Sequence, residues 1–168
     1  MELSNISKKM YQEGQKDEEL VMNITHDTFR CNVRKSTKYE DTHDHVDFWC
    51  IKNGKEFGID VKGLRKNKRT DTDYDDTINW IELLNVKGEP GWIYGKSSYI
   101  AFMTKESILY VPTKDLVNFV ESKVRGQGIT SIRPDDFYKP YRRKDRQDLI
   151  IKVPTSDLRN LAKHEIKY

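Results

Sequence analysis

The chain has 168 residues, of which 36% are hydrophobic and 34% are charged, with a formal net charge of +3. This length suits one domain, and it is enough to bury a core without metal or disulfide support. No apolar run is long enough to span a membrane, and the first ten residues lack the apolar stretch of a signal peptide, so we expect a cytosolic protein without membrane attachment. Cys31 and Cys50 both lie in apolar-patterned stretches, and we expect them to be reduced core residues.

Apolar spacing predicts a mixture of helices and strands. A helix is expected over 4–24, where Ser4 is a candidate N-cap, and a strand is expected over 28–34. Asn53-Gly54 between two apolar runs predicts a hairpin with a type I′ turn. The other expected elements are hairpin strands at 45–52 and 56–62, strands at 78–86, 98–104, 107–112 and 149–154, and helices at 113–124 and 156–167. Together they predict one α/β domain over 1–168, with a central mixed β-sheet flanked by helices.

Three charged residues interrupt the apolar hairpin: Asp47 in its first strand, and Asp60 and Lys62 in its second. Side chains alternate along a strand, so Asp60 and Lys62 point the same way, and the tight turn brings Asp47 within reach. Two carboxylates supply the hard oxygen ligands that Mg²⁺ or Mn²⁺ prefers, and a lysine can orient a water against a phosphate. The pattern therefore indicates metal-assisted phosphodiester hydrolysis. The alternative is an edge hairpin whose charges are solvated on its open face.

Basic residues cluster at 62–69 and 142–146, and acidic residues at 71–76. Basic clusters can contact phosphates, which gives affinity without sequence information, although a solvated charged surface is the alternative. The candidates for phosphate contacts are Lys66, Lys68, Arg69, Arg142, Arg143 and Arg146.

Other side chains are weaker candidates. The aromatic residues Trp80, Trp92 and Tyr94 can stack on bases, although such residues in turns often pack locally. His43 and His45 could be metal ligands or a general base, but loop polarity explains them equally well, and Glu82 has either a supporting or a surface role.

The motif Val46-Asp47 followed by Asp60-Val61-Lys62 resembles the PD-(D/E)xK nuclease superfamily, which has the restriction-endonuclease-like fold. The resemblance implies that Asp47, Asp60 and the main-chain carbonyl of Val61 hold Mg²⁺, and that Lys62 positions the attacking water and the phosphate. There are two departures from the pattern. Val46 stands where proline is expected, and Asp60 stands where glutamate is frequent.

The superfamily also places a glutamate on the helix before the sheet, often in the pattern G-x-x-x-E-x-x-V. Gly14 and Glu18 fit this pattern, which makes Glu18 a possible further metal ligand, and its neighbour Glu19 stays open as an alternative. The resemblance covers about residues 8 to 120. The stretch "WIELLNVKGEPGWIYGKSSYIAF" is also similar to small phage-encoded nucleases, which would act in the host cytoplasm.

From the residues and this resemblance we expect an Mg²⁺-dependent deoxyribonuclease, for which Mn²⁺ can substitute, and favour an endonuclease over an exonuclease. One alternative is a catalytically inactive module that binds DNA or a partner, and another is a nuclease directed at RNA or branched DNA. Cleavage of both DNA strands by a one-site domain would suggest a homodimer.

Overall fold

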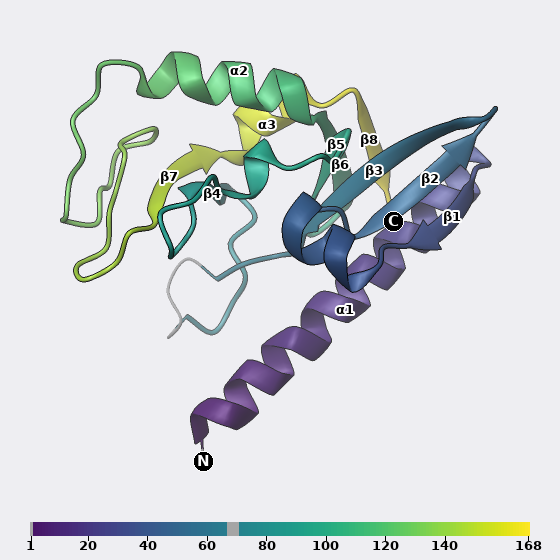
Figure 1. The fold of residues 1–168 in the computed structure, drawn as a ribbon, viewed down its shortest axis with the longest axis horizontal. Helices are drawn as coiled ribbons and strands as arrows, with labels where there is room; N and C mark the ends of the chain where they lie inside the picture. The colour runs from purple at the N-terminus through teal and green to yellow at the C-terminus, as the bar shows by residue number, and fades with distance from the viewer. Residues whose placement is uncertain (1, 67–70) are drawn as a thin grey trace.

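The computed structural model describes residues 2–66 and 71–168, and it shows an α/β fold with a mixed six-stranded sheet flanked by helices (Figure 1). The helical elements are α1 (Glu2–Phe29), α2 (Thr113–Val124) and α3 (Thr155–Leu161), with a short η1 (Glu40–Asp44) and η2 (Trp92–Tyr94). The strands are β1 (Asn32–Lys35), β2 (Phe48–Lys52), β3 (Lys55–Lys62), β4 (Ile78–Leu84), β5 (Tyr99–Met103), β6 (Ser107–Pro112), β7 (Leu149–Pro154) and β8 (His164–Lys167). None of the helices in these ranges is long and apolar enough to cross a bilayer.

The β2–β3 hairpin forms as predicted. Asn53 and Gly54 have φ angles of 52° and 73°, the positive values that a type I′ turn requires at both central positions. The two strands pair antiparallel, with Phe48 beside Ile59. Asp47 lies one residue before β2, and its N–H donates to the Ile59 carbonyl at 2.8 Å, so it stays attached to β3.

The main sheet has the order β1-β2-β3-β5-β6-β8, in which β3 and β5 run parallel and the other neighbouring pairs run antiparallel. The chain between β3 and β5 contains β4, but β4 leaves the main sheet and pairs with β7 in a separate two-stranded sheet. The predicted strand at 78–86 therefore exists, although it is not a direct neighbour of the hairpin.

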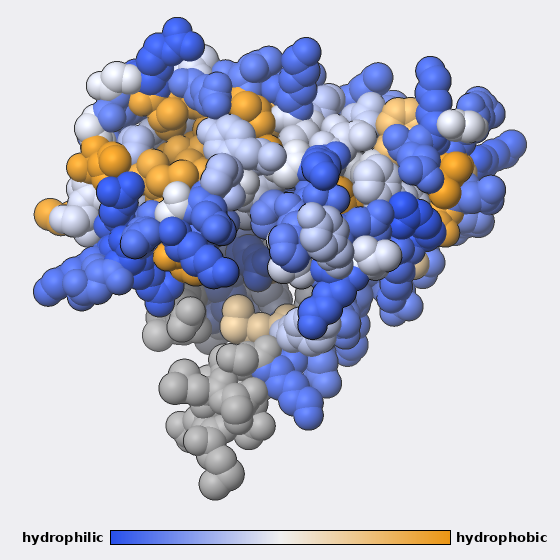
Figure 2. All heavy atoms as spheres, viewed as in Figure 1, coloured by the Kyte–Doolittle hydropathy of each residue, from blue (hydrophilic) through white to orange (hydrophobic). Residues whose placement is uncertain are grey.

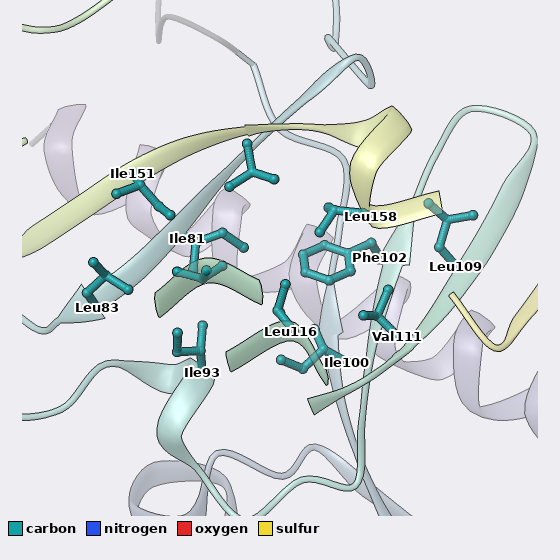
Figure 3. Packing of buried hydrophobic residues seen from close by; sticks show 12 residues of the cluster. Ile81, Leu83, Ile93, Ile100, Phe102, Leu109, Val111, Leu116, Ile151 and Leu158 are labelled. Carbon is teal, nitrogen blue, oxygen red and sulfur yellow. The ribbon is translucent and has the colours of Figure 1, made fainter. Parts of the chain in front are cut away.

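Two apolar clusters cover the two faces of the main sheet. On one face, Val21 of α1 packs with Phe48, Ile59 and Val61. The other face packs against α2, α3 and the β4–β7 sheet through a larger cluster that includes Ile100 and Phe102 (Figure 3). Each fully buried side chain of this size contributes about 1.5–3 kcal/mol to folding. The first cluster holds β3 through Ile59 and Val61, and the larger cluster holds the neighbouring strands β5 and β6.

Side chains alternate between the two faces of β3, and this alternation places Asp60 and Lys62 on the face of the larger cluster. In the parallel pairing, Asp60 lies beside Ile100 and Lys62 lies beside Phe102, and both neighbours belong to that cluster. The charges thus occupy positions of a central strand where apolar residues would extend the core. The alternative of an edge hairpin with solvated charges is wrong, because β3 also pairs with β5 and Asp60 is buried.

Three local predictions need correction. The first helix begins at Glu2, so Ser4 is inside it, and it extends to Phe29, so the first strand starts only at Asn32. The last predicted helix ends at Leu161, and His164–Lys167 forms β8 instead. This segment pairs antiparallel with β6, a tertiary contact that overrides its helical pattern.

The cysteines also differ from expectation. The structure joins Cys31 and Cys50 in a disulfide, with their Cα atoms 5.9 Å apart. Cys31 directly precedes β1, and Cys50 pairs with Val33 across the β1–β2 ladder, which brings the two side chains together. The separation of 19 residues in sequence gave no indication of this pairing.

Candidate functional site

Asp60 is the most buried charged residue of the hairpin. Only 2% of its surface is exposed. The Lys62 Nζ donates to its Oδ1 at 2.6 Å, whereas its Oδ2 is buried and no donor among the described residues reaches it. Burial raises the pKa of Asp60. A buried carboxylate oxygen without a donor is costly, so a cation or a proton from a neighbouring acid would stabilise it.

Asp47 brings a second carboxylate to Asp60. The Val61 N–H donates to Asp47 Oδ2 at 2.6 Å and so orients the acid along β3. Burial, and next the negative charge of Asp60, raise the pKa of Asp47 to about 7. The Asn53-Gly54 hairpin thus brings the two acids close enough to interact, as its turn and alternation predict. Two acids in one buried place repel each other, and a bound divalent cation would remove that repulsion.

Glu18 on α1 is the third acid close to this place. Burial, and next the negative charge of Asp47, raise the pKa of the Glu18 carboxyl to about 7, so Glu18 interacts electrostatically with the hairpin. Its neighbour Glu19 is exposed. Of the two helix glutamates, Glu18 is therefore the one affected by the charge of Asp47, and its role as a metal ligand stays a prediction.

The two hairpin acids fit a magnesium site in which water molecules supply most of the ligands. Within residues 8–66 and 71–168, no three His, Cys, Asp or Glu side chains converge closely enough to hold a metal ion among themselves. Mg²⁺, however, usually keeps several waters and binds through one or two carboxylates. Asp47 and Asp60 supply such a pair, and the buried Oδ2 of Asp60 is an acceptor without a donor. The Val61 carbonyl and Glu18 stay predicted ligands.

Lys62 has a second partner, Trp92, that the sequence pattern does not indicate. Its ammonium lies 4.4 Å from the centre of the Trp92 ring, in addition to its bond to Asp60. The lysine side chain is 22% exposed, so it is held between a carboxylate and an aromatic face while still reaching solvent.

The position of Trp92 depends on a close backbone approach. A Cβ on Gly91 would lie 2.0 Å from the Glu82 carbonyl oxygen, so the turn carrying η2 packs directly against β4. No pattern in the hairpin indicates the contact between Lys62 and Trp92. The one sequence signal that could have indicated it is the glycine, Gly91, immediately before Trp92 in the turn.

A cavity of about 440 Å³ opens beside Lys62, between the end of β3 and the β4–β7 sheet. Figure 2 shows a recess in the molecular surface between the part of the chain that carries β4 and β7 and the part that carries β2 and β3. Glu82 lines this cavity, and burial raises the pKa of its carboxyl. Glu82 belongs to the second sheet and lies in the same lining as Lys62, and its supporting role stays a prediction. The lining also includes Arg65, Lys66, Trp80, Trp92, Tyr141 and Arg143.

The predicted phosphate-contact residues separate into different environments. Lys66 is exposed and lines the cavity, with its ammonium 5.8 Å from the Tyr74 ring. Arg143 also lines the cavity, but two of its nitrogens donate to the fully buried Asp148. Arg146 is exposed and away from the cavity lining.

The remaining candidates are less informative. Arg142 is half-buried and does not line the cavity, while Lys68 and Arg69 lie outside the described residues. The ring of His43 stacks on Tyr39 with ring centres 4.3 Å apart. Burial, and next the charge of Lys62, lower the pKa of His45, so this imidazole lies close enough to the site to be affected by that charge.

No protein-family model, no curated protein and no solved structure matches this chain.

Proposed function

We propose that this protein is a divalent-metal-dependent nuclease that hydrolyses DNA phosphodiester bonds, with Mg²⁺ as its metal and Mn²⁺ as a substitute. The observation that carries the proposal is the group of Asp47, Asp60 and Lys62 on a central hairpin, where Asp60 is 2% exposed. Burying one uncompensated ion costs several kcal/mol. Keeping Asp47 and Asp60 on this hairpin lowers the folding stability of the protein. Residues that lower stability in this way are typical of functional sites.

Each residue has a role that follows from its surroundings. Asp47, oriented by the Val61 N–H, and Asp60, with one oxygen lacking a donor, would hold the metal. The metal, when bound, would stabilise the charge that develops on the phosphate. Lys62 is fixed by Asp60 and Trp92 and is partly exposed, so its ammonium can hold the attacking water and a phosphate oxygen. The Val61 carbonyl and the Glu18 carboxylate would be the further ligands of the metal.

The order of elements supports a restriction-endonuclease-like core for this proposed enzyme. A helix bearing Glu18 precedes the hairpin with the acids, and a parallel strand, β5, follows beside the second hairpin strand. The antiparallel strand β6 and helix α2 come next in the chain. This is the succession that the resemblance predicts for residues 8 to 120.

The test is cleavage of linear, circular and single-stranded DNA in Mg²⁺, Mn²⁺ or EDTA, using the wild type and the variants Asp60→Asn and Lys62→Met. Both variants should lose metal-dependent cleavage while their circular dichroism stays that of the wild type. Lys55→Met is the matched control, because Lys55 is an exposed lysine on the same strand, and it should cleave normally. Wild-type rates in both site variants would disprove the proposal.

The same panel separates the alternatives. DNA binding without metal-dependent product would favour an inactive binding module, and cleavage of RNA or branched DNA alone would favour a different substrate. If the protein cuts both strands of a duplex, sedimentation in the presence of DNA should show the homodimer that a single site of this kind requires. The cytosolic location, including the cytoplasm of a host cell, stays a prediction.

A further inference from the structure

The cavity beside Lys62 has a size and lining that the hydrolytic site itself does not require. Its volume of about 440 Å³ falls in the range of roughly 300–1,000 Å³ that is typical of small-molecule sites. It begins at Lys62 and continues toward the β4–β7 sheet, away from Asp47 and Asp60, neither of which lines it. Whatever occupies the cavity would therefore lie next to the reacting phosphate.

Two half-buried aromatic rings form one wall of this cavity. Trp80 belongs to β4 and Tyr141 to the segment before β7, and their ring centres are 6.4 Å apart with planes tilted by 53°. The Arg133 guanidinium lies 5.1 Å from the centre of the Trp80 ring. Aromatic and guanidinium planes of this kind are the surfaces on which unpaired nucleic-acid bases stack.

Fixed positive charge lies beside these rings. Arg143 is held by Asp148 through its Nε and one terminal nitrogen, which leaves further N–H donors of the guanidinium for another partner. Because Arg143 is already immobilised, it loses little side-chain entropy when a ligand binds. Arg65 and Lys66 add charge to the same lining. These cations can hold the sugar–phosphate backbone while a base occupies the aromatic wall.

Acceptor groups in the lining favour a base over a free anion. Glu82 lines the cavity with a carboxylate, and Asn79 uses its amide nitrogen on Thr155 Oγ1 at 2.9 Å, which leaves its amide oxygen as an acceptor. A phosphate placed against Glu82 would be repelled. The edge of a base carries N–H donors that both groups can accept, so the occupant combines apolar faces with polar N–H groups.

We infer that this cavity binds an unpaired nucleotide of the substrate strand next to the scissile phosphate, so that the preferred substrate is DNA with unpaired bases at the cleavage point. A base inside a duplex is stacked on both sides, and moving it into a cavity costs a few kcal/mol, whereas an unpaired base avoids most of this cost. The inference rests on the proposed nuclease function, because Lys62 defines where the phosphate lies.

The direct test is binding in EDTA, where no cleavage occurs, of a fluorescent oligothymidylate and of a duplex of equal length. The wild type should bind the single strand more tightly than the duplex. Trp80→Leu and Tyr141→Leu should each weaken single-strand binding about tenfold, the change that about 1.4 kcal/mol of lost stacking gives, and leave duplex binding unchanged. Tyr94→Leu is the control, since Tyr94 is an exposed aromatic of η2 that does not line the cavity.

Two further measurements keep the outcomes distinct. Quenching of the wild-type tryptophan fluorescence by oligothymidylate reports stacking without any variant, so a misfolded Trp80→Leu protein does not prevent the test. Hydrolysis of bis-p-nitrophenyl phosphate, which has no base, reports the metal site alone. Equal binding of single strand and duplex with no effect of Trp80→Leu would overturn the inference even if Asp60-dependent hydrolysis persists. If the wild type instead binds the single strand but shows no Asp60-dependent hydrolysis of bis-p-nitrophenyl phosphate, the proposed nuclease function is overturned.

Discussion

Replacing Asp47 by asparagine should stabilise the metal-free protein while abolishing its activity. Asparagine keeps an oxygen that can accept from the Val61 N–H, so the main orienting contact of this side chain survives. What the substitution removes is a carboxylate that burial and Asp60 make unfavourable when it is ionised. The variant is thus a test of whether the hairpin acids are strained against each other.

The size of the effect follows from the raised pKa. A change from the ordinary value of 3.8 to about 7 corresponds to about 4 kcal/mol, at about 1.4 kcal/mol for each tenfold change in the ionisation constant. Asp47 is partly exposed, and solvent screening reduces this ceiling, so we expect about 2 kcal/mol. For a chain of this length, such a difference raises the melting temperature by about 4–8 °C.

The sign of the pH dependence is equally specific. The folded wild type holds the Asp47 proton up to about pH 7, whereas the unfolded chain releases it near pH 4, so the stability of the wild type falls as the pH rises between these values. The Asp47→Asn variant has no ionisable group at this position, so its stability does not fall for this reason over the same pH range. The stability difference should be near zero below about pH 4 and complete above about pH 8.

Urea unfolding in EDTA at several pH values measures this difference directly. Added Mg²⁺ at about pH 8 should stabilise the wild type more than the variant, because only the wild type keeps both carboxylates for the ion. An Asp47→Asn protein that is less stable than the wild type at high pH would refute the reasoning. A stability difference that is the same at low and high pH would refute it too.

Three further substitutions test other parts of the site. Glu18→Gln should weaken metal-dependent cleavage, measured as the Mg²⁺ concentration needed for half-maximal rate, whereas Glu19→Gln should not, because Glu19 is exposed. Arg143→Ala should lower the free energy of unfolding by about 3 kcal/mol, since it leaves a fully buried aspartate without its partner; a loss below about 0.5 kcal/mol in urea unfolding would contradict this pairing. Gly91→Ala should destabilise by about 1–3 kcal/mol, because its Cβ would collide with the backbone of β4. Gly14→Ala, a helix position with nothing within 4 Å, should instead stabilise by about 0.5–1 kcal/mol, and equal thermal shifts for the two alanine variants would show that the η2 turn can yield.

Local signals predicted the hairpin and its acids well. Period-two alternation and the Asn53-Gly54 turn act over a few residues, and they placed Asp60 and Lys62 on one face and Asp47 near them. The helical pattern likewise placed Glu18 on the helix before the sheet. These features need no knowledge of distant partners, which is why the sequence was sufficient for them. The extent of the domain over 1–168 stays a prediction.

Features that depend on distant partners were not predictable. The pairing of β4 with β7, the strand at His164–Lys167 and the Cys31–Cys50 bond each join segments whose local patterns say nothing of the partner. The same holds for the contact between Lys62 and Trp92, which depends on how a turn packs on another strand. In each case tertiary contacts, which a local pattern does not encode, decided the outcome.

The separation of β4 and β7 from the main sheet has a consequence for how such a protein can change over time. In the proposed enzyme, the hydrolytic residues belong to an interior strand locked between β2 and β5, and substitutions there would disturb the centre of the fold. The aromatic wall of the cavity lies on the other sheet, because Trp80 belongs to β4 and Tyr141 bridges to Ile150 of β7. Lys62 and Phe102 of the main sheet line the same cavity. If the proposed function holds, substitutions at Trp80 and Tyr141 would change the substrate preference without altering the residues of the proposed reaction.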